Sequence, residues 1–487
     1  MEEKNMEKRV LAGLQPERAL YYFEEICKIP HGSRNTKQIS DYLVGFAREH
    51  GLRCVQDEVN NVVIYKDGTP GYAHHPTVIL QGHMDMVAEK TKESTIDFSK
   101  DPLALRTDGE YIWAEGTTLG GDDGIAVAYA LAILEADNIP HPPLECVFTV
   151  DEEIGMEGAA ALDPALLQGR VFINCDSEAE GILTVSCAGG ATSGLELPLT
   201  IEKAEGKGIH IYVDGLAGGH SGAEINKGRA NANKVMGELL AKLLKLTPYR
   251  LVYVRGGQKD NAIPRYSMAK IIVANNLLEE ALRNIDKLSA ELLKQLPKEE
   301  TKAKITRETC VCRGRAMSML STRKAVGLLR DVPNGIQAMS KDIEGLVQTS
   351  LNLGILKTED GKLSMTFSVR SSVNEEKIEL IERLKKAGEK YGAAYSEHGA
   401  YPAWEYRKNS PLRDLMVRVF ERLYGRKPVV EAIHAGLECG LFSGKLPGLD
   451  CVSFGPDMQD IHTTRERLNI ASAARTWRYL LAVLEQL

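Results

Sequence analysis

The chain has 487 residues, 60 Lys and Arg against 67 Asp and Glu, a formal charge of −7, and 43% hydrophobic residues. This length predicts roughly two to four folding units, and the apolar content excludes a mainly disordered chain. The mild acidity argues against nucleic-acid binding, because phosphate contacts need clustered Lys and Arg.

The first part of the chain alternates predicted helices and strands. Helices are expected at 16–29, 36–50, from the Gly-rich stretch 119–124 to about 136, and near 163–168, and strands at 61–65, 77–80, 144–150 and 171–174. Such alternation indicates an α/β fold with parallel strands in its sheet.

The pattern changes after about residue 187. Residues 187–398 combine long amphipathic helices with strands of period two, such as KLSMTFSVR. Further helices are expected at 231–246, 277–296 and 375–388, and then at 411–424 and 469–485. We interpret 187–398 as an inserted α+β domain, long enough for two βαββαβ units in tandem. The α/β domain then comprises residues 1–186 and 399–487.

Nothing in the sequence predicts membrane insertion or secretion. No apolar run approaches 18 residues, and the first ten residues, MEEKNMEKRV, are charged and unlike a signal sequence. The nine cysteines are odd in number and scattered, which favours reduced thiols over a disulfide framework. We therefore expect a cytoplasmic protein.

Acidic residues and histidines follow the predicted strands of the α/β domain. His83 and Asp85 lie two apart, so their side chains point the same way, and the carboxylate can accept a hydrogen bond from the imidazole. The other residues of this kind are Asp122, Glu152, Glu153, Asp176 and His462. Because ligands bind at the carboxyl ends of strands in open α/β sheets, we expect these side chains to converge.

Two histidines and three carboxylates form a nitrogen and oxygen ligand set suited to zinc or manganese. Five side chains around two ions about 3.5–4 Å apart require one bridging carboxylate, and a sixth carboxylate could remove a proton from the shared water. Each motif alone is more often a surface pair or a turn. Five such clusters at successive strand ends are hard to attribute to chance, and together they predict a dinuclear metal centre.

Seven motifs resemble those of the dinuclear-zinc metallopeptidase family of carnosinase, carboxypeptidase G and succinyl-diaminopimelate desuccinylase. They are GHMDMV, LGGDDGIA, TVDEEIG, NCDSE, GGHSG, NAIPR and IHTTRE. They occur in the family's order and span nearly the whole chain. The resemblance implies a zinc-peptidase-like catalytic domain with a central mixed sheet flanked by helices, and an inserted α+β lid domain. It also implies two divalent ions per chain, zinc foremost, with manganese or cobalt as alternatives.

The resemblance implies the metal ligands residue by residue. His83, Asp122 and Asp176 would hold one zinc, and Asp122, Glu153 and His462 would hold the other. Asp122 would bridge the two ions. Some relatives carry Glu at the position of Asp176.

Further catalytic roles follow from the same resemblance. Glu152 would be the general base, and Asp85 would orient the first metal-ligating histidine. Asp123, which is Asn in many relatives, would not be a ligand. His220, within AGGHSG, matches the residue that stabilises the tetrahedral oxyanion.

Three residues resemble substrate binders. Asn261 in NAIPR and Arg370 in FSVRSS resemble ligands of the substrate carboxylate, and a bidentate Arg suits a peptide's C-terminus. Glu438, in HAGLECG, could meet the free α-amino group of a substrate.

The implied activity is hydrolysis of dipeptides with a free amino terminus, of Xaa-His or carnosine type or of broad specificity. A metal-bridging hydroxide would attack, with Glu152 as general base. An amidohydrolase acting on N-acyl amino acids is the alternative within the same class, and a non-catalytic binding module is the alternative of another class. The expected partners are small dipeptides. The family often dimerises through its inserted domain, so homodimer and monomer both stay open.

Overall fold

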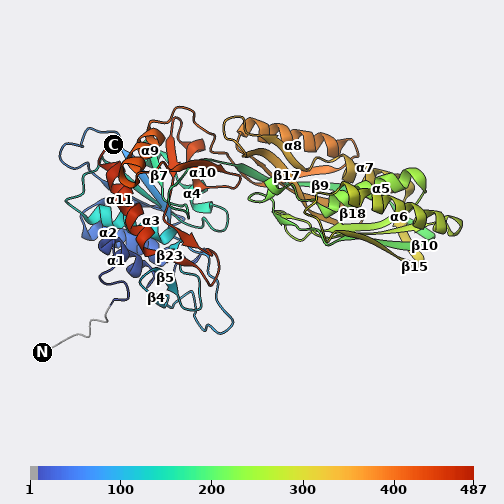
Figure 1. Cartoon of the computed structure of the whole chain (residues 1–487), viewed down its shortest axis with the longest axis horizontal. Coiled ribbons are helices and arrows are strands. Elements are labelled where there is room, and N and C mark those ends of the chain that lie inside the picture. Colours follow the sequence, from blue (N-terminus) through green and yellow to red (C-terminus); the bar gives the residue numbers. More distant parts are fainter. Residues whose placement is uncertain (1–8) are drawn as a thin grey trace. The chain divides into compact units, whose positions relative to one another are not determined.

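The computed structural model describes residues 9–487, apart from the side chains of residues 311–313. Most of the charged start MEEKNMEKRV therefore lies outside the described residues. The chain divides into two compact units (Figure 1). The first unit comprises Met1–Ser186, Tyr406–Ala432 and Leu437–Leu487, and the second comprises Cys187–Glu405 and Ile433–Gly436. The second unit runs past residue 398, where the sequence predicted its end, because the strand β19 (Ala394–Tyr401) belongs to its sheet.

An eight-stranded sheet forms the centre of the first unit. Its strands, in spatial order, are β1 (Arg53–Gln56), β2 (Val62–Lys66), β6 (Leu144–Thr149), β3 (Val78–His83), β7 (Val171–Asn174), β21 (Asp450–Ser453), β8 (Ile182–Cys187) and β20 (Val429–Ile433). The strands β6, β3, β7 and β21 run parallel, whereas β1 and β2 pair antiparallel. The predicted mixed sheet is therefore confirmed.

Helices of the first unit share one hydrophobic core with this sheet. They include α1 (Glu17–Ile26), α2 (Lys37–Glu49), α3 (Gly121–Glu135), α9 (Pro411–Tyr424) and α11 (Ile470–Leu484). Helix α3 is buried almost along its whole length, because it is apolar on every side and packs against α1 and β3. A small second sheet contains β22 (Met458–Gln459), β23 (Arg467–Asn469), β5 (Tyr111–Ala114) and β4 (Leu105–Thr107).

The prediction of a short helix near 163–168 is wrong in the position and type of the helix. The chain instead forms α4 (Glu157–Ala161) and then one 3₁₀ turn at Pro164–Leu166. Asp163 is extended, and its carboxylate accepts a hydrogen bond from the Ala165 N–H. This local side-chain bond caps a turn rather than a longer helix.

A nine-stranded antiparallel sheet forms the second unit. Its strands, in spatial order, are β15 (Lys304–Met317), β10 (Ile201–Asp214), β14 (Ser267–Val273), β12 (Arg250–Gly256), β17 (Val347–Glu359), β18 (Lys362–Ser371), β9 (Gly189–Pro198) and β19, and β16 (Gly335–Met339) pairs with β17. Four helices share its core: α5 (Ala232–Leu246), α6 (Leu278–Gln295), α7 (Met319–Asp331) and α8 (Asn374–Glu389).

Two βαββαβ units make up this sheet, as expected, but they are nested rather than in tandem. The first unit is β10-α5-β12-β14-α6-β15. The second begins with β9 before that unit and resumes after it as α7-β17-β18-α8-β19. The two units join at a seam where Gly256 of β12 pairs with Leu356 of β17. Nesting is compatible with one continuous sheet because the edge strands of both units can still pair.

No helix within residues 9–487 is long and apolar enough to cross a bilayer. None of the eight cysteines with described side chains forms a disulfide. The prediction of reduced cysteines is confirmed for these eight, while Cys312 lies outside the described side chains.

Candidate metal centre

Side chains that follow three parallel strands meet at one edge of the first unit's sheet. His83 ends β3, Glu152 and Glu153 follow β6, and Asp176 follows β7. The strand β3 pairs in parallel with both β6 and β7, so the three carboxyl ends lie together. Asp122 reaches the same place from the start of α3.

Asp122 lies between the two predicted histidine ligands. Its Oδ1 is 3.1 Å from Nε2 of His83, and its Oδ2 is 3.1 Å from Nε2 of His462. Nε2 of His462 is also 3.0 Å from Oε2 of Glu153, and Nε2 of His83 is 3.8 Å from Oδ1 of Asp176. The two oxygens of Asp122 thus face different histidines, which is the arrangement that a bridging carboxylate requires.

The electrostatics of the cluster fit divalent cations. Ligand atoms of His83, Asp122 and Glu153 lie within 4.8 Å of one another, as do those of His83, Asp123 and Asp176. Oε1 of Glu153 and both carboxylate oxygens of Asp123 are buried without a hydrogen-bond partner. Within residues 9–487, no Lys or Arg forms an ion pair with these carboxylates. Buried, unpaired carboxylates are costly, so the residues present suit two bound cations.

Asp123 is brought into the cluster although the resemblance leaves it outside the ligand set. It is fully buried, and a Cβ at Gly82 would lie 2.7 Å from its Oδ2. Burial raises the pKa of Asp123, and the nearby Asp122 and Glu438 act in the same direction. Only a glycine at position 82 leaves room for this carboxylate beneath the cluster.

Burial and neighbouring charges set the protonation of the other groups. Burial raises the pKa of Glu152 to about 8; the charge of His83 opposes this, and Glu438 and Glu153 add to it. Hydrogen bonds to Asp122 and Glu153 raise the pKa of His462 to about 10. Bound divalent ions would add positive charge and lower these pKa values. A carboxylate with a pKa near neutrality is suited to proton transfer.

Asp85 lies beside His83, but its carboxylate makes different contacts from those expected. Nδ1 of His83 is 2.9 Å from the backbone carbonyl oxygen of Asp85 and 3.5 Å from its carboxylate Oδ1. The carboxylate accepts hydrogen bonds from the Ser33 hydroxyl at 2.8 Å and the Glu152 N–H at 3.0 Å. A carbonyl can only accept, so Nδ1 carries the proton and Nε2 is left as the ligand nitrogen.

Glu438 is fully buried in the first unit. It is 0% exposed at the start of α10 (Glu438–Lys445), and its Oε2 accepts hydrogen bonds from the Gln81 amide and the Thr149 hydroxyl. Burial raises its pKa to about 7. The predicted contact with a substrate amino group stays a prediction, and in this conformation the carboxylate is buried inside the first unit.

Glu466 is a buried carboxylate at the end of the motif IHTTRE, and the resemblance implies no role for it. It accepts backbone N–H bonds from Leu119 at 2.8 Å, Gly120 at 3.2 Å, Gly121 at 2.8 Å and Asp122 at 3.4 Å. Glu466 lies four residues after His462, so it ties the loop of one proposed ligand to the loop of another. The signal was the Gly-rich stretch itself, since its free N–H groups need an acceptor.

Gly120 shows why that stretch contains glycine. Its φ of 69° is left-handed, and a Cβ there would lie 2.9 Å from Sδ of Met86 and 3.2 Å from Nε2 of His31. A side chain at this position would meet both strain and a clash. The glycine allows the chain to turn sharply and present Asp122 at the start of α3.

His220 and Asn261 lie next to each other in the second unit. The short strands β11 (Gly219–His220) and β13 (Ala262–Ile263) pair, and the Ser221 N–H donates to the Asn261 carbonyl at 2.8 Å. Arg370, on β18, donates weakly to the Tyr401 hydroxyl at 3.4 Å, and its Nε is buried without a partner. Burial and the charge of Arg370 lower the pKa of His220.

His434 joins these residues in the second unit; it is the first residue of the motif HAGLECG, but no role was expected for it. Its Nε2 lies 2.7 Å from the Ser350 hydroxyl. Burial and the charge of Arg370 lower its pKa to about 4. Arg370 therefore lies near two neutral histidines, and this cluster has the chemistry to bind a carboxylate.

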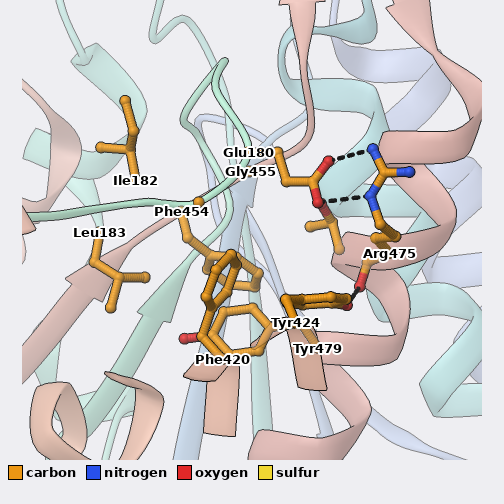
Figure 2. A pocket seen from close by; sticks show the side chains of 11 residues that line it. Glu180, Ile182, Leu183, Phe420, Tyr424, Phe454, Gly455, Arg475 and Tyr479 are labelled. Atoms are coloured by element: carbon orange, nitrogen blue, oxygen red, sulfur yellow. Dashed lines mark hydrogen bonds and ion pairs between the residues drawn. The ribbon is translucent and has the colours of Figure 1, made fainter. Parts of the chain in front are cut away.

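Another pocket in the first unit does not offer a comparable site (Figure 2). It is lined by aromatic rings that include Phe420 and Tyr479, and by Arg475, which binds both oxygens of Glu180 at 2.7 and 2.6 Å. Its free volume of about 10 Å³ holds about one water molecule. We interpret it as a packing defect of the core.

The chain is similar to known proteins over nearly its whole length. The model of "Peptidase family M20/M25/M40" matches residues 79–486. The chain is 37% identical over 480 residues to a cytosol non-specific dipeptidase of Escherichia coli (strain K12), covering 98% of this chain and 99% of that protein. The structure of an aminoacylhistidine dipeptidase from Vibrio alginolyticus matches with a TM-score of 0.93 and 35% identity, over 99% of this chain and 98% of that one. An aminopeptidase from Bacillus cereus matches over 97% of this chain and 99% of that one, with a TM-score of 0.55 and 16% identity, which is a likeness of fold alone.

Proposed function

Because the chain belongs to peptidase family M20/M25/M40 and is thus a peptide hydrolase, we propose that it hydrolyses dipeptides with a free amino terminus. The substrate class is supported by relatives that are 37% and 35% identical over nearly the whole chain and are named as dipeptidases. We place the enzyme in the cytoplasm, in keeping with the name of the first relative and with eight described cysteines that form no disulfide.

One observation supports metal-dependent hydrolysis, namely the position of Asp122 between His83 and His462. One histidine lies against each carboxylate oxygen of Asp122. We assign one ion to His83, Asp122 and Asp176, and the other to Asp122, Glu153 and His462. Zinc suits this ligand set, which manganese and cobalt can also use. When bound, such ions polarise the scissile carbonyl and lower the pKa of water.

We assign Glu152 as the general base. Its carboxylate makes no hydrogen bond to any described residue, and its raised pKa of about 8 would fall toward neutrality near bound cations. It can take the proton of the attacking water and return it to the leaving amine. Asp85 positions both groups, since its carbonyl orients His83 and its carboxylate holds the Glu152 N–H.

For the second unit we propose the roles that the resemblance implies. Arg370 and Asn261 would bind the C-terminal carboxylate of the dipeptide, and His220 would stabilise the oxyanion. The lowered pKa of His220 is consistent with a neutral imidazole that donates a hydrogen bond without holding a full charge. We propose no substrate contact for Glu438, because it is fully buried.

The test is a substrate comparison on zinc-loaded protein. We expect Ala-His to be hydrolysed with a kcat/KM at least 100-fold above that of an N-acetyl amino acid. The variant Glu152→Gln should keep two ions per chain, by metal analysis, and lose at least 10³-fold in kcat. Preference for the acylated substrate would make the protein an amidohydrolase instead, and full activity of the variant would overturn the assignment of the base.

A further inference from the structure

The second unit contains an open cavity of about 660 Å³ at the seam of its two βαββαβ units. The cavity lies along the segment that joins β12 to β14 and reaches β17 across the seam. Its lining includes Tyr266, which is 38% exposed, beside the buried residues Ile263, Pro264, Met268 and Leu356. This volume and apolar lining are typical of small-molecule sites.

Four exposed cations line the same cavity: Arg255, Lys259, Arg265 and Lys357. No acidic residue lines it, and within residues 9–487 none of the four forms an ion pair. Arg265 donates through Nε to the Leu216 carbonyl, which leaves its terminal nitrogens free. Neither lysine ammonium has a hydrogen-bond partner among the described residues. The cavity therefore carries positive charge that the protein itself does not neutralise.

The register of the seam places two of these cations side by side. Gly256 pairs with Leu356 in an antiparallel ladder, so Arg255 lies opposite Lys357 one position along. Their other cross-strand neighbours are uncharged: Met268 opposite Arg255 and Ser364 opposite Lys357. Like charges directly opposite each other destabilise a sheet. An anion bound between them would relieve this repulsion. The cationic pair stands out because the chain as a whole has a net charge of −7.

We propose that this cavity binds a small organic anion that has an apolar body and at least two negative charges. The body would lie against the exposed ring of Tyr266, and the negative groups would pair with Arg255 and Lys357. A dipeptide is a poor occupant, because its ammonium group would meet the cationic rim. The ligand proposed for this cavity is therefore a different molecule from the dipeptide substrate. An occupant would contact β13, the strand that pairs with the strand of His220.

The test uses naphthalene-1,5-disulfonate, whose aromatic body matches the lining and whose sulfonates chelate metal ions poorly. Calorimetric titration of the zinc-loaded full chain at low ionic strength should give saturable binding of one molecule per chain. The double variant Arg255→Gln/Lys357→Gln should raise the Kd at least tenfold. Inorganic sulfate should bind at least tenfold more weakly than the disulfonate, because it cannot use the apolar lining.

The matched control is Lys203→Gln/Arg315→Gln. These two exposed cations also face each other across strands of the same sheet, but neither of them lines this cavity. This variant should change the Kd by less than twofold. Equal losses in both variants, no saturable binding to the wild type, or sulfate binding as tight as the disulfonate would each overturn the proposal. Circular-dichroism melting verifies that both double variants fold. If Arg255→Gln/Lys357→Gln does not fold, the single variant Lys357→Gln replaces it and is expected to weaken binding by at least threefold.

Discussion

Replacing Glu466 by Gln tests whether this carboxylate holds the metal loop. In the structure, Oε2 accepts N–H bonds from Leu119 and Gly120, and Oε1 accepts from Gly121 and Asp122. A glutamine keeps one acceptor oxygen but turns an NH₂ group toward two N–H donors. Two buried donors therefore lose their acceptor, and the loop that carries Asp122 loses half of its attachment.

The expected size of the effect follows from these bonds. An unpaired buried donor costs about 1–3 kcal/mol, so two should lower the free energy of unfolding by about 2–6 kcal/mol. Displacement of the Asp122 loop should also weaken metal binding, because a group that orients a ligand typically contributes roughly 10- to 100-fold in affinity. The second effect separates a positioning role from a purely structural one.

Glu145→Gln is the matched control. Glu145 is also buried, 4% exposed against 3% for Glu466, and it accepts backbone N–H bonds from Gln168 and Gly169 at 3.0–3.1 Å. It lies near the start of β6, at the opposite end of that strand from Glu152 and Glu153. Its replacement should lower stability while leaving the metal site intact.

Zinc affinity is measured by competition with a fluorescent chelator, and stability by urea unfolding of the metal-free chain. We expect both variants to be destabilised and only Glu466→Gln to lose at least tenfold in zinc affinity. The reasoning is refuted if Glu466→Gln binds zinc as tightly as the wild type, or if Glu145→Gln loses as much affinity.

Four further results are expected. By elemental analysis, Asp122→Asn should contain less than one zinc ion per chain, whereas Asp123→Asn should keep two. Two ions in Asp122→Asn and less than one in Asp123→Asn would exclude Asp122 as the bridge. Arg370→Lys should raise the KM for Ala-His about tenfold with less than a threefold change in kcat, because an ammonium cannot bind a carboxylate in bidentate fashion; an unchanged KM would remove Arg370 from substrate binding. In the metal-free chain, folded Glu152 keeps its proton up to a pKa of about 8, against an ordinary value of 4.5, so its contribution to stability is present below pH 4.5 and is lost as pH rises through 8. Between pH 6.5 and 8, urea unfolding of the wild type should show a loss about 2 kcal/mol larger than that of Glu152→Gln, and an equal or smaller loss would contradict the burial argument. Chelation should abolish hydrolysis and added zinc, manganese or cobalt should restore it, whereas activity that survives exhaustive chelation would exclude the metal centre.

Much of the first unit could be predicted because its signals are local. The long helices show in apolar periodicity and in end signals such as Ser410, whose hydroxyl accepts the Arg413 N–H at the start of α9. The parallel strands are recognisable as apolar runs, and His83, Glu153 and Asp176 lie at or just after their ends. Because parallel strands end at one edge of a sheet, the sequence indicated which side chains would converge.

The second unit was less predictable. Its strands and long helices show in periodicity, but the nesting of the two βαββαβ units depends on which edge strands pair. The pairing of Gly256 with Leu356 joins residues 100 apart in the chain. Both tandem and nested arrangements satisfy the same local pattern, so no short-range signal distinguishes them.

The sequence by itself determined the elements, the sheet edge and the proposed ligands, because periodicity and strand ends are properties of neighbouring residues. Only the tertiary structure decided the roles of buried polar groups. Glu466 meets N–H groups more than 340 residues away, Glu438 meets Gln81 inside the core, and Arg255 faces Lys357 across a seam. Whether a buried polar or charged group finds a hydrogen-bond partner depends on which distant segment packs beside it, and that depends on the complete fold.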